Sequence, residues 1–485
     1  MKKNDNNGKN LVSRRSTLKA IGAVGAAAFL GSSPAYAKGK KTDSSNATYS
    51  SSDIRKKISQ KVAGTPFIDT HEHLMDERER LAGKAKVDDW SLLFSHYFNS
   101  DLISAGMPSD AYKKFISKEV APLDKWPLVE PYWPAVKNTG YGRNVRISLK
   151  MLYDVDELSA KTIKQVQAGY ERVRRRGFYK NILCDLANIE SCQVNYLGGQ
   201  TFHESEMPTL LMQDISILGM TTCSDIEGPS KPAGIVVSSL ADWHRVIDWW
   251  FDKYGKYAVA VKTQHAYMRN IDFEKVTPEQ AEPVFKKRLA GQDLSPPERK
   301  LMEDHLFWYA VDKATACNLP VKLHTGYYAG ENSMGIWHIR DNPLWAAELC
   351  RMSPQTKFVF MHISYPYYEE MLAIAKHYTN AYLDMCWAWI INPVASKDFL
   401  KKFIVTVPAN KVLTFGGDYI PVELVLGHAV IAREGITNAL TELVEEKCLT
   451  LDDALELTDV IMNGNARKLF NLAEKTRLLK NVNWS

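Results

Sequence analysis

Short apolar runs, several of which end in histidine, lysine or aspartate, constrain the fold of this chain more than any other feature. Eight of them recur with longer amphipathic stretches between them: Phe67–His71, Asn181–Leu186, Leu210–Ile217, Ala258–Gln264, Pro320–His324, Lys357–His362, Ala381–Cys386 and Val412–Asp418. Continuous apolar strands joined by helical crossovers are typical of a parallel sheet that is covered on both faces. Eight such units predict an α/β fold, a (β/α)8 TIM barrel.

An open, doubly wound sheet is the structural alternative. Helical patterns over Leu240–Tyr254 and Pro297–Cys317 would serve as crossovers in either fold. However, no expected strand is followed by the glycine-rich turn that holds a dinucleotide in doubly wound folds. We therefore favour the closed barrel, over residues 53–478.

Two connections are too long to be plain crossovers, residues 74–180 and residues 265–319. A segment that leaves the carboxyl end of a barrel strand lies over the mouth of the barrel. We therefore expect residues 74–180 to form a helical insertion over the mouth and to help build a substrate pocket.

The first 37 residues have the pattern of an export signal. Arg14 and Arg15 precede the apolar run Ala20–Leu30, and Ala35-Tyr36-Ala37 supplies a cleavage site after Ala37. The arginine pair resembles a twin-arginine signal, which predicts a periplasmic or otherwise exported protein. The apolar run is shorter than the roughly 20 residues of a membrane span, so we expect no stable membrane anchor after cleavage. Residues 38–52 are polar and serine-rich, which predicts a flexible linker.

The charge of the chain is concentrated in this segment. Residues 1–37 hold six of the 61 Lys and Arg residues and one of the 56 Asp and Glu residues, so 55 of each sign remain. A balanced chain lacks the basic surface that nucleic acids or anionic membranes select. We expect a small-molecule substrate and no nucleic-acid partner, and a homo-oligomer remains open.

Polar side chains stand where the expected strands end, which is where active sites of this fold lie. The residues concerned are His71, His73, Lys262, His324, His362 and Asp418. His71 and His73 are two residues apart and so project from the same side of a strand. Each residue alone has an ordinary structural explanation, but imidazole and carboxylate groups together are the ligands of Zn2+ and similar ions. The set predicts a metal site.

This order of residues resembles the amidohydrolase superfamily of metal-dependent barrel enzymes: His-x-His on strand one, Lys on strand four, His on strands five and six, and Asp on strand eight. Four stretches are similar to its amidohydrolase-related branch: Val261–Arg269, His324–Gly326, His362–Pro366 and Asn380–Trp387. That branch includes the amidohydrolase-like domain fused to glutamine-synthetase-like modules. Uronate isomerases are more distant relatives.

The resemblance implies that His71, His73, His324 and Asp418 bind a divalent metal, for which we expect Zn2+. Asp418 would also carry the proton of the attacking water. His362 is either a second metal ligand or a hydrogen-bond donor to the substrate. Lys262 either becomes a carbamate that bridges two metals or stays an ammonium that pairs with a substrate carboxylate. We favour the ammonium and one metal.

Five residues that follow strands four to seven are candidates for substrate binding: Tyr267, Arg269, Arg340, Tyr365 and Trp387. The two arginines and Lys262 favour an anionic substrate. The resulting prediction is a metal-dependent hydrolase that opens an amide, ester, lactone or related C–N or C–O bond with a metal-activated water. A metal-dependent decarboxylase, a uronate-type isomerase and a non-catalytic exported binding protein remain alternatives.

Overall fold

The computed structural model describes residues 50–484 except 329 and 331–334. The predicted signal peptide and residues 38–49 of the predicted linker lie outside the described residues. Helix α1 (Ser51–Gly64) begins where the side chain of Ser50 accepts a hydrogen bond from the Asp53 amide. The linker prediction is therefore wrong at residues 51 and 52, because a serine cap starts a helix there.

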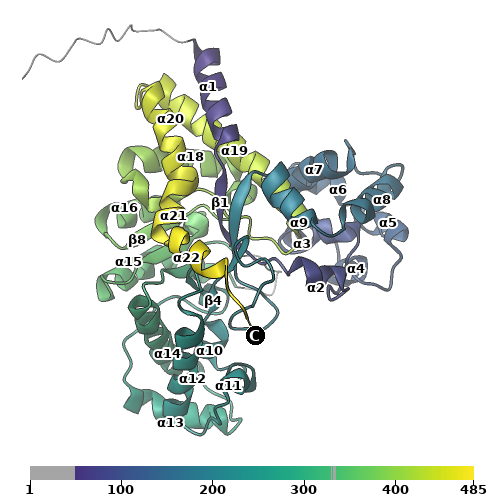
Figure 1. Ribbon diagram of the computed structural model, residues 1–485. Helices are drawn as coiled ribbons and strands as arrows, with labels where there is room; N and C mark the ends of the chain where they lie inside the picture. Colours follow the sequence, from purple (N-terminus) through teal and green to yellow (C-terminus); the bar gives the residue numbers. More distant parts are fainter. Residues whose placement is uncertain (1–49, 329, 331–334, 485) are drawn as a thin grey trace, which may run out of the picture. The chain divides into compact units, whose positions relative to one another are not determined.

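The described residues form nine strands in two parallel sheets (Figure 1), one ordered β1-β2-β3 and the other ordered β4 to β9. The strands are β1 (Phe67–Glu72), β2 (Ile189–Val194), β3 (Leu211–Gln213), β4 (Ile215–Ser216), β5 (Val261–Thr263), β6 (Val321–His324), β7 (Phe358–Met361), β8 (Ala381–Asp384) and β9 (Val412–Leu413). Only Asp214 separates β3 from β4, so these two occupy one strand position. Seven of the eight predicted strands are confirmed.

The second predicted strand is wrong. Residues Asn181–Leu186 form a π-helical turn, η3, and the strand is β2, three residues further on. Short apolar runs cannot be assigned to strand or helix by periodicity alone. The true strand was also obscured by Ser191 and Gln193, polar residues that are buried within the fold.

Backbone hydrogen bonds connect the segment after β9 to β1. They run from Thr70 N–H to the Phe415 carbonyl at 3.0 Å, from Asp418 N–H to the His71 carbonyl at 2.9 Å, and from His73 N–H to the Tyr419 carbonyl at 3.0 Å. The last strand position therefore neighbours the first, as in a barrel and unlike an open doubly wound sheet. The fold class is the predicted α/β barrel.

Helices follow most strands. Those of the barrel are α10 (Leu218–Thr222), α11 (Glu227–Ala233), α12 (Leu240–Tyr254), η4 (His265–Tyr267), α13 (Pro278–Leu289), α14 (Pro296–Ala316), η5 (Trp337–Asp341), α15 (Asn342–Met352), η6 (His362–Ser364), α16 (Tyr368–His377), α17 (Ala388–Ile391), α18 (Pro393–Thr406) and η7 (Ala409–Lys411). The chain ends in α19 (Val422–Glu445), α20 (Leu451–Asp459), η8 (Val460–Gly464), α21 (Asn465–Leu469) and α22 (Leu472–Leu479). Among the described residues, no helix combines the length and apolarity that crossing a bilayer requires.

The long connection between β1 and β2 is helical throughout (Figure 1). It holds α2 (Glu77–Leu81), η1 (Trp90–Phe94), α3 (Phe98–Ser104), α4 (Ser109–Phe115), η2 (Pro122–Asp124), α5 (Trp126–Val129), α6 (Trp133–Val136), α7 (Gly140–Tyr153), α8 (Ile163–Val173), α9 (Phe178–Lys180) and η3. Helix α7 packs against α19, which ties the insertion to the barrel. Because β2 starts at Ile189, the connection extends to residue 188.

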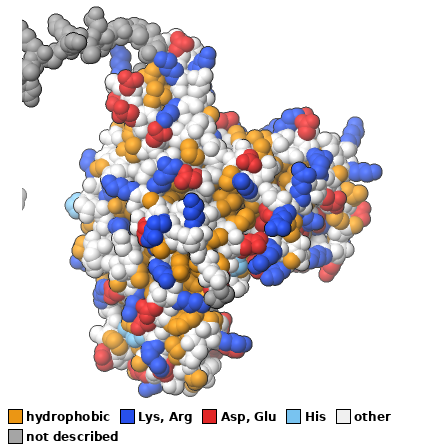
Figure 2. Space-filling model, viewed as in Figure 1, with side chains coloured by type: hydrophobic (Ala, Val, Ile, Leu, Met, Phe, Trp, Pro, Cys, Tyr) orange, Lys and Arg blue, Asp and Glu red, His pale blue; other side chains and the backbone are white. Residues whose placement is uncertain are grey.

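An apolar cluster lies at the amino ends of the strands. Ile68, Met212, Ala260, Val359 and Leu413 are buried there with Phe470 of the chain's last segment. This layer closes one end of the barrel, so polar side chains inside the ring gather toward the opposite end. The visible face of the described residues carries basic and acidic side chains intermingled (Figure 2).

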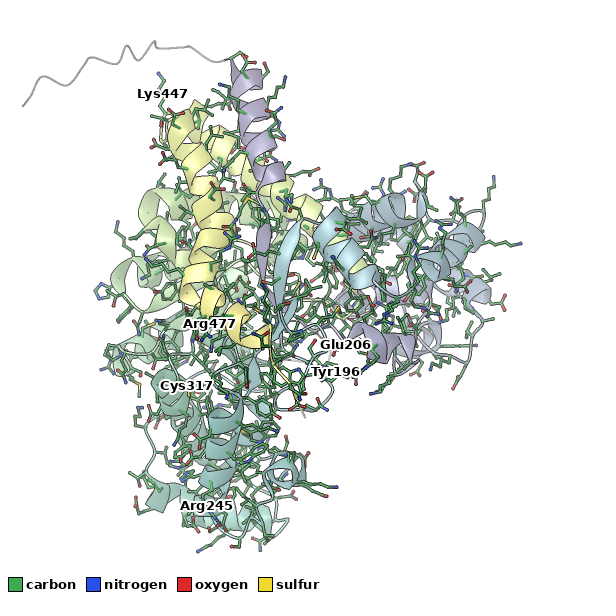
Figure 3. The ribbon with its side chains drawn as sticks, viewed as in Figure 1. Tyr196, Glu206, Arg245, Cys317, Lys447 and Arg477 are labelled. Carbon is green, nitrogen blue, oxygen red and sulfur yellow. The ribbon has the colours of Figure 1, made fainter. Side chains whose placement is uncertain are left out.

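All seven cysteines lie in the described part of the chain and are unpaired. Four of them are buried, Cys317 directly follows α14 (Figure 3), and Cys448 is exposed. No disulfide therefore stabilises the described fold.

Candidate metal centre

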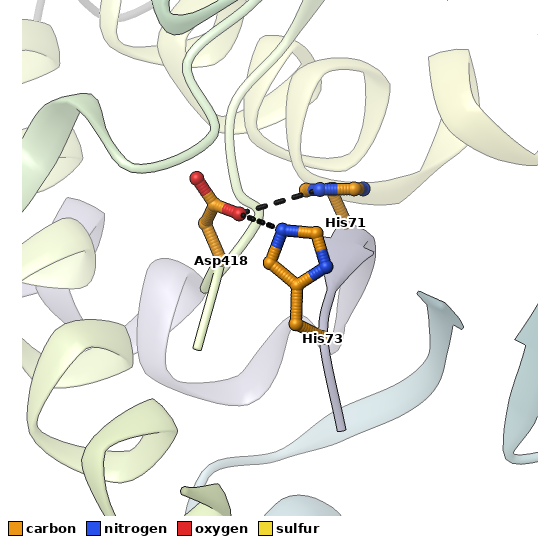
Figure 4. A group of neighbouring side chains, drawn as sticks. All are labelled: His71, His73 and Asp418. Carbon is orange, nitrogen blue, oxygen red and sulfur yellow. Dashed lines mark ion pairs between the residues drawn. The ribbon is translucent and has the colours of Figure 1, made fainter. Parts of the chain in front are cut away.

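His71, His73 and Asp418 meet at the carboxyl end of β1 (Figure 4). The Nε2 atoms of His71 and His73 lie 3.3 and 3.1 Å from the same carboxylate oxygen, Oδ1 of Asp418. All three side chains are buried. The hydrogen bond between Asp418 N–H and the His71 carbonyl holds the two segments together, so backbone pairing brings residues that are far apart in sequence to one point.

The chain adopts unusual backbone conformations where it supplies these groups. Asp418, His362 and Trp387 have positive φ angles of 59°, 63° and 64°. Such conformations are costly for residues with side chains and cluster at functional sites. Gly417 precedes Asp418, and a Cβ at this glycine would lie 1.8 Å from Oε1 of Glu72, so only glycine fits beside that buried carboxyl group.

A second group of potential ligands shares Asp418. His362, Cys386 and Asp418 present ligand atoms that lie within 4.8 Å of one another, as do those of His71, His73 and Asp418. His71 Nε2, His362 Nε2 and Asp418 Oδ1 are buried and have no hydrogen-bond partner of good geometry. Buried polar atoms are normally satisfied, so these groups fit a divalent cation, which would satisfy them.

His324 lies next to these groups but belongs to neither of them in the described structure. Its ring centroid is 4.3 Å from that of His362, and its Nε2 lies 3.0 Å from the Tyr327 carbonyl, to which it can donate a hydrogen bond. Gly326 permits this local geometry, because its φ is +71° and a Cβ there would lie 2.4 Å from the Ser364 backbone. His324 is thus adjacent to the centre, and its role as a ligand stays a prediction.

Burial favours the neutral form of three imidazoles at the centre, those of His71, His324 and His362. It lowers the pKa of His71 and His324 well below the ordinary value and lowers that of His362 to about 4. Burial alone would raise the pKa of Asp418, but the contacts from His71 and His73 outweigh it and hold that pKa well below its ordinary value. Neutral imidazoles and an ionised carboxylate are the forms that bind metals.

Lys262 lies on β5, in register with Lys322 of the neighbouring strand β6. Burial lowers its pKa to about 8, although the charge of Asp418 opposes the shift. A lysine with this pKa has an appreciable neutral fraction near neutral pH, which carbamate formation requires, while most of it remains ammonium. Both predicted forms of Lys262 are compatible with this environment.

A buried ion pair next to the centre was not predicted from the sequence. Lys322 lies 2.9 Å from Asp214 and donates a hydrogen bond to the Thr70 carbonyl at 2.7 Å, and both charged groups are buried. Asp214 in turn lies 4.0 Å from Nδ1 of His71. The signal was available: Lys322 precedes His324 by two residues on β6 and therefore projects from the same face of that strand.

The helical insertion places two more residues next to the centre, His96 and Tyr97, which were not predicted from the sequence. The His96 ring lies 5.6 Å from that of His73, and Tyr97 lies 4.2 Å from Trp387, measured between ring centroids. Burial, and then the nearby charge of Asp418, raises the pKa of the Tyr97 hydroxyl. No sequence pattern marked this pair, because it lies in the insertion and not at a strand end.

Two of the five predicted substrate-binding residues, Trp387 and Tyr267, lie beside histidines of the centre. Trp387 is buried with its ring 5.2 Å from that of His362, and the Tyr267 ring is 4.7 Å from that of His324. The hydroxyl of Tyr365 accepts a hydrogen bond from Asn392 at 3.2 Å. The role of these aromatic side chains as walls for a small substrate stays a prediction.

The two predicted arginines are placed differently. Arg269 contacts three carboxylates, those of Glu303, Asp272 and Asp304, at 3.2, 3.0 and 2.7 Å. The side chain of Arg340 is 73% exposed and lies 3.5 Å from Asp341. The expectation that both arginines are available to bind a substrate carboxylate is not supported, because one is already neutralised by protein acids and the other faces solvent.

The barrel carries the buried His, His and Asp cluster that the sequence's resemblance to metal-dependent barrel enzymes predicts. Residues 237–472 match the model of the family described as amidohydrolase. The matched segment contains Lys262, His324, His362 and Asp418. His71 and His73 lie outside it, and the fold brings them to Asp418.

Solved structures of the same fold are similar over most of the chain. A uronate isomerase from Thermotoga maritima is 15% identical, with a TM-score of 0.69, 86% of this chain and 97% of that chain covered. Glucuronate isomerase from Caulobacter crescentus is 17% identical, with a TM-score of 0.69 and 88% and 95% covered. A protein from Lactobacillus casei described as a putative metal-dependent hydrolase is 16% identical, with a TM-score of 0.61 and 87% and 99% covered.

A curated relative, protein fluG of Emericella nidulans, is 27% identical over 165 residues. The match covers 34% of this chain and 18% of that protein. The chain therefore corresponds to a small part of that relative.

Proposed function

We propose that this protein is a metal-dependent hydrolase that opens an amide, ester, lactone or related bond of a small polar molecule. One observation carries the proposal: Asp418 Oδ1 lies 3.3 and 3.1 Å from the Nε2 atoms of His71 and His73 in a buried cluster at the end of β1. This arrangement joins metal ligands to a carboxylate that can move a proton. Zn2+ is our preferred ion, because the ligand set offers imidazole, carboxylate and thiol groups.

A divalent ion bound here would polarise a substrate carbonyl and lower the pKa of a coordinated water. Asp418 accepts the proton of the attacking water and transfers it to the leaving group. His362 faces the other oxygen of Asp418, with Nε2 3.9 Å from Oδ2. Its Nδ1 donates a hydrogen bond to the Cys386 carbonyl at 2.9 Å, so the unpartnered Nε2 of the neutral ring carries a lone pair and can coordinate the cation. The aromatic walls and the insertion exclude water from the reacting groups.

Lys262 is the remaining cation at the centre. As an ammonium it attracts an anionic group of the substrate, and as a carbamate it would bridge two ions. We keep the one-metal form as our proposal.

The mixed surface charge in Figure 2 supports a small-molecule substrate over nucleic acid. Export to the periplasm, from the first 37 residues, is also part of the proposal.

The substitution Asp418→Asn tests the proton-transfer role. Asparagine is similar in size and tolerates the positive φ of this position, so we expect the fold to survive while turnover falls by about 10²–10⁴-fold. Asp154→Asn is the matched control, because Asp154 is exposed and has a φ of 55°. Full activity of Asp418→Asn in a hydrolase assay with excess Zn2+ would remove the assigned role.

The products decide the reaction class. Products whose combined mass exceeds that of the substrate by one water support hydrolysis, whereas release of CO2 indicates the decarboxylase alternative. Metal content of protein purified with and without bicarbonate distinguishes one metal from two. Two metals per chain that depend on bicarbonate would replace the one-metal proposal by a carbamate on Lys262.

Isomerisation of a sugar acid is the second candidate, and the position of Tyr97 favours it. A phenol and a carboxylate close together can exchange protons with neighbouring carbon and oxygen atoms of one substrate, as an isomerase requires. Tyr97 supplies that phenol beside Asp418. A product of unchanged mass, lost in Tyr97→Phe, would support the isomerase over the hydrolase.

A further inference from the structure

A polar cleft of about 610 Å³ opens at the carboxyl ends of β2, β4 and β5. Its wall includes Asn195 after β2, Ser216 at the end of β4 and Gln264 after β5. Tyr196, labelled in Figure 3, lies on the same wall. The mechanism proposed above uses none of these side chains, although the carboxyl ends of barrel strands are where this fold binds ligands.

Asn195 connects the cleft to the metal centre. Its carbonyl oxygen lies 2.6 Å from Nδ1 of His73 and can accept a hydrogen bond from that ring. Its side chain is 1% exposed, and Oδ1 has no hydrogen-bond partner. An amide oxygen can only accept hydrogen bonds, so a ligand that satisfies it must bring an O–H or N–H group.

Several charged residues of the cleft make contacts within the protein, whereas Asp293 and Arg299 at its edge are exposed. Arg269 contacts Glu303, and Arg288 donates hydrogen bonds to the carbonyls of Cys223 and Ser224 at 2.9 and 3.2 Å. Asp225 accepts a hydrogen bond from the Gly228 amide at 3.0 Å. Beside them, the wall offers neutral groups such as those of Gln200, Thr201, Thr222 and Gln264. This chemistry suits an uncharged polar ligand.

Gly219 of α10 leaves space in this cleft. It lines the cleft, its φ lies outside the left-handed region, and a Cβ built on it meets no atom within 4 Å. A side chain at this position can therefore enter the cleft without disturbing the backbone. Gly219 is the point from which the cleft can be blocked.

We propose that this cleft binds an uncharged arm of the substrate that is rich in hydroxyl or amide N–H groups, while the metal centre acts on the other end of the same molecule. Asn195 stands between the two sites, and its free Oδ1 receives the donor nearest to the scissile bond. This inference rests on the proposed function for the position of that bond. The binding of the arm is independent of it.

The test measures binding by saturation-transfer NMR on the zinc-loaded full chain. The probes are two matched pairs, glucose with glucuronate and N-acetylalaninamide with N-acetylalaninate. Gly219→Ala adds a small side chain to the cleft and Gly219→Trp a large one, so the two variants fill the cleft to different extents. Gly64→Trp is the matched control, because a Cβ at Gly64 in α1 also meets no atom within 4 Å.

We expect at least one neutral probe to bind, with affinity at least tenfold weaker in Gly219→Trp, less than threefold changed in Gly219→Ala and unchanged in Gly64→Trp. Binding of the anionic probes alone, binding of none of the four, or binding insensitive to Gly219→Trp in a folded variant would overturn the inference. If Gly219→Trp does not fold, Thr222→Trp, from the same wall, takes its place. Failure of hydrolysis with neutral binding intact would overturn only the proposed function.

Discussion

At the scale of single residues, the metal centre depends on buried partners that do not face the substrate. Nδ1 of His71 is turned toward Asp214, which is held by Lys322. Ligating histidines commonly direct their second nitrogen to a carboxylate, which fixes the tautomer and the ring orientation. The 4.0 Å separation is longer than a hydrogen bond, so we expect Asp214 to act through its charge, which favours a proton on Nδ1 and leaves Nε2 of His71 free for the metal.

Asp214→Asn should weaken Zn2+ binding by about 10–100-fold, because it removes the charge that orients His71. Competition with a chromogenic chelator measures this affinity without any substrate. The control is Asp89→Asn, which makes the same change in another buried pair, Asp89 with Lys125 at 2.6 Å in the insertion. Equal Zn2+ affinity in the two variants would contradict the positioning role.

At the scale of elements, one buried arginine joins the insertion to the barrel. Arg80 of α2 lies 2.7 Å from Glu423 in the first turn of α19 and donates hydrogen bonds to Asp88 and Tyr170. Arg80 and Glu423 are 3% and 1% exposed, so water cannot solvate either charged group if its partner is removed. This contact holds the helical insertion against the barrel, and the same insertion places His96 and Tyr97 beside the metal centre.

Arg80→Met should lower the free energy of unfolding by about 3–5 kcal/mol, because it leaves Glu423 buried without its cation. Denaturant titration followed by tryptophan fluorescence measures the loss. Arg477→Met provides the comparison, because its pair with Glu474 is exposed and should change stability by less than about 1 kcal/mol. Similar losses in both variants would show that the Arg80 contact does not anchor the insertion.

At the scale of the whole molecule, buried neutral histidines make the stability depend on pH. His265 is 1% exposed, and burial, followed by the charge of Arg269, lowers its pKa to about 3. The unfolded chain binds a proton at His265 near its ordinary pKa of 6.5, whereas the folded chain does not until about pH 3. Stability from this residue is therefore present above pH 6.5 and is lost as pH falls from 6.5 toward 3.

The measurement compares the wild type with His265→Gln between pH 7 and pH 4. The unfolding free energy of the wild type should fall by about 3 kcal/mol more than that of the variant over this range, since one pKa unit corresponds to about 1.4 kcal/mol. His377→Gln, at an exposed position, should follow the wild type. Parallel curves for the wild type and His265→Gln would refute the assigned contribution.

The sequence predicted the residues at strand ends because a buried parallel strand leaves a clear apolar run. His71, His73, Lys262, His324, His362 and Asp418 were all identified in this way, and the described structure brings three of them into one ligand group. β2 was missed because its inner face carries Ser191 and Gln193, so its pattern is not apolar. His96 and Tyr97 were missed because no periodicity links an insertion to a strand end.

The amino-acid sequence by itself determined seven of the eight strand positions of the barrel and the types of residue at the strand ends, because these follow from local periodicity and composition. Only the tertiary structure decided which groups meet. It formed ion pairs between Arg269 and three acids and between Lys322 and Asp214, and it placed His324 beside the ligand groups. The physical reason is that ion pairs and metal ligands depend on distances through space, which closure of the barrel sets and spacing along the chain does not.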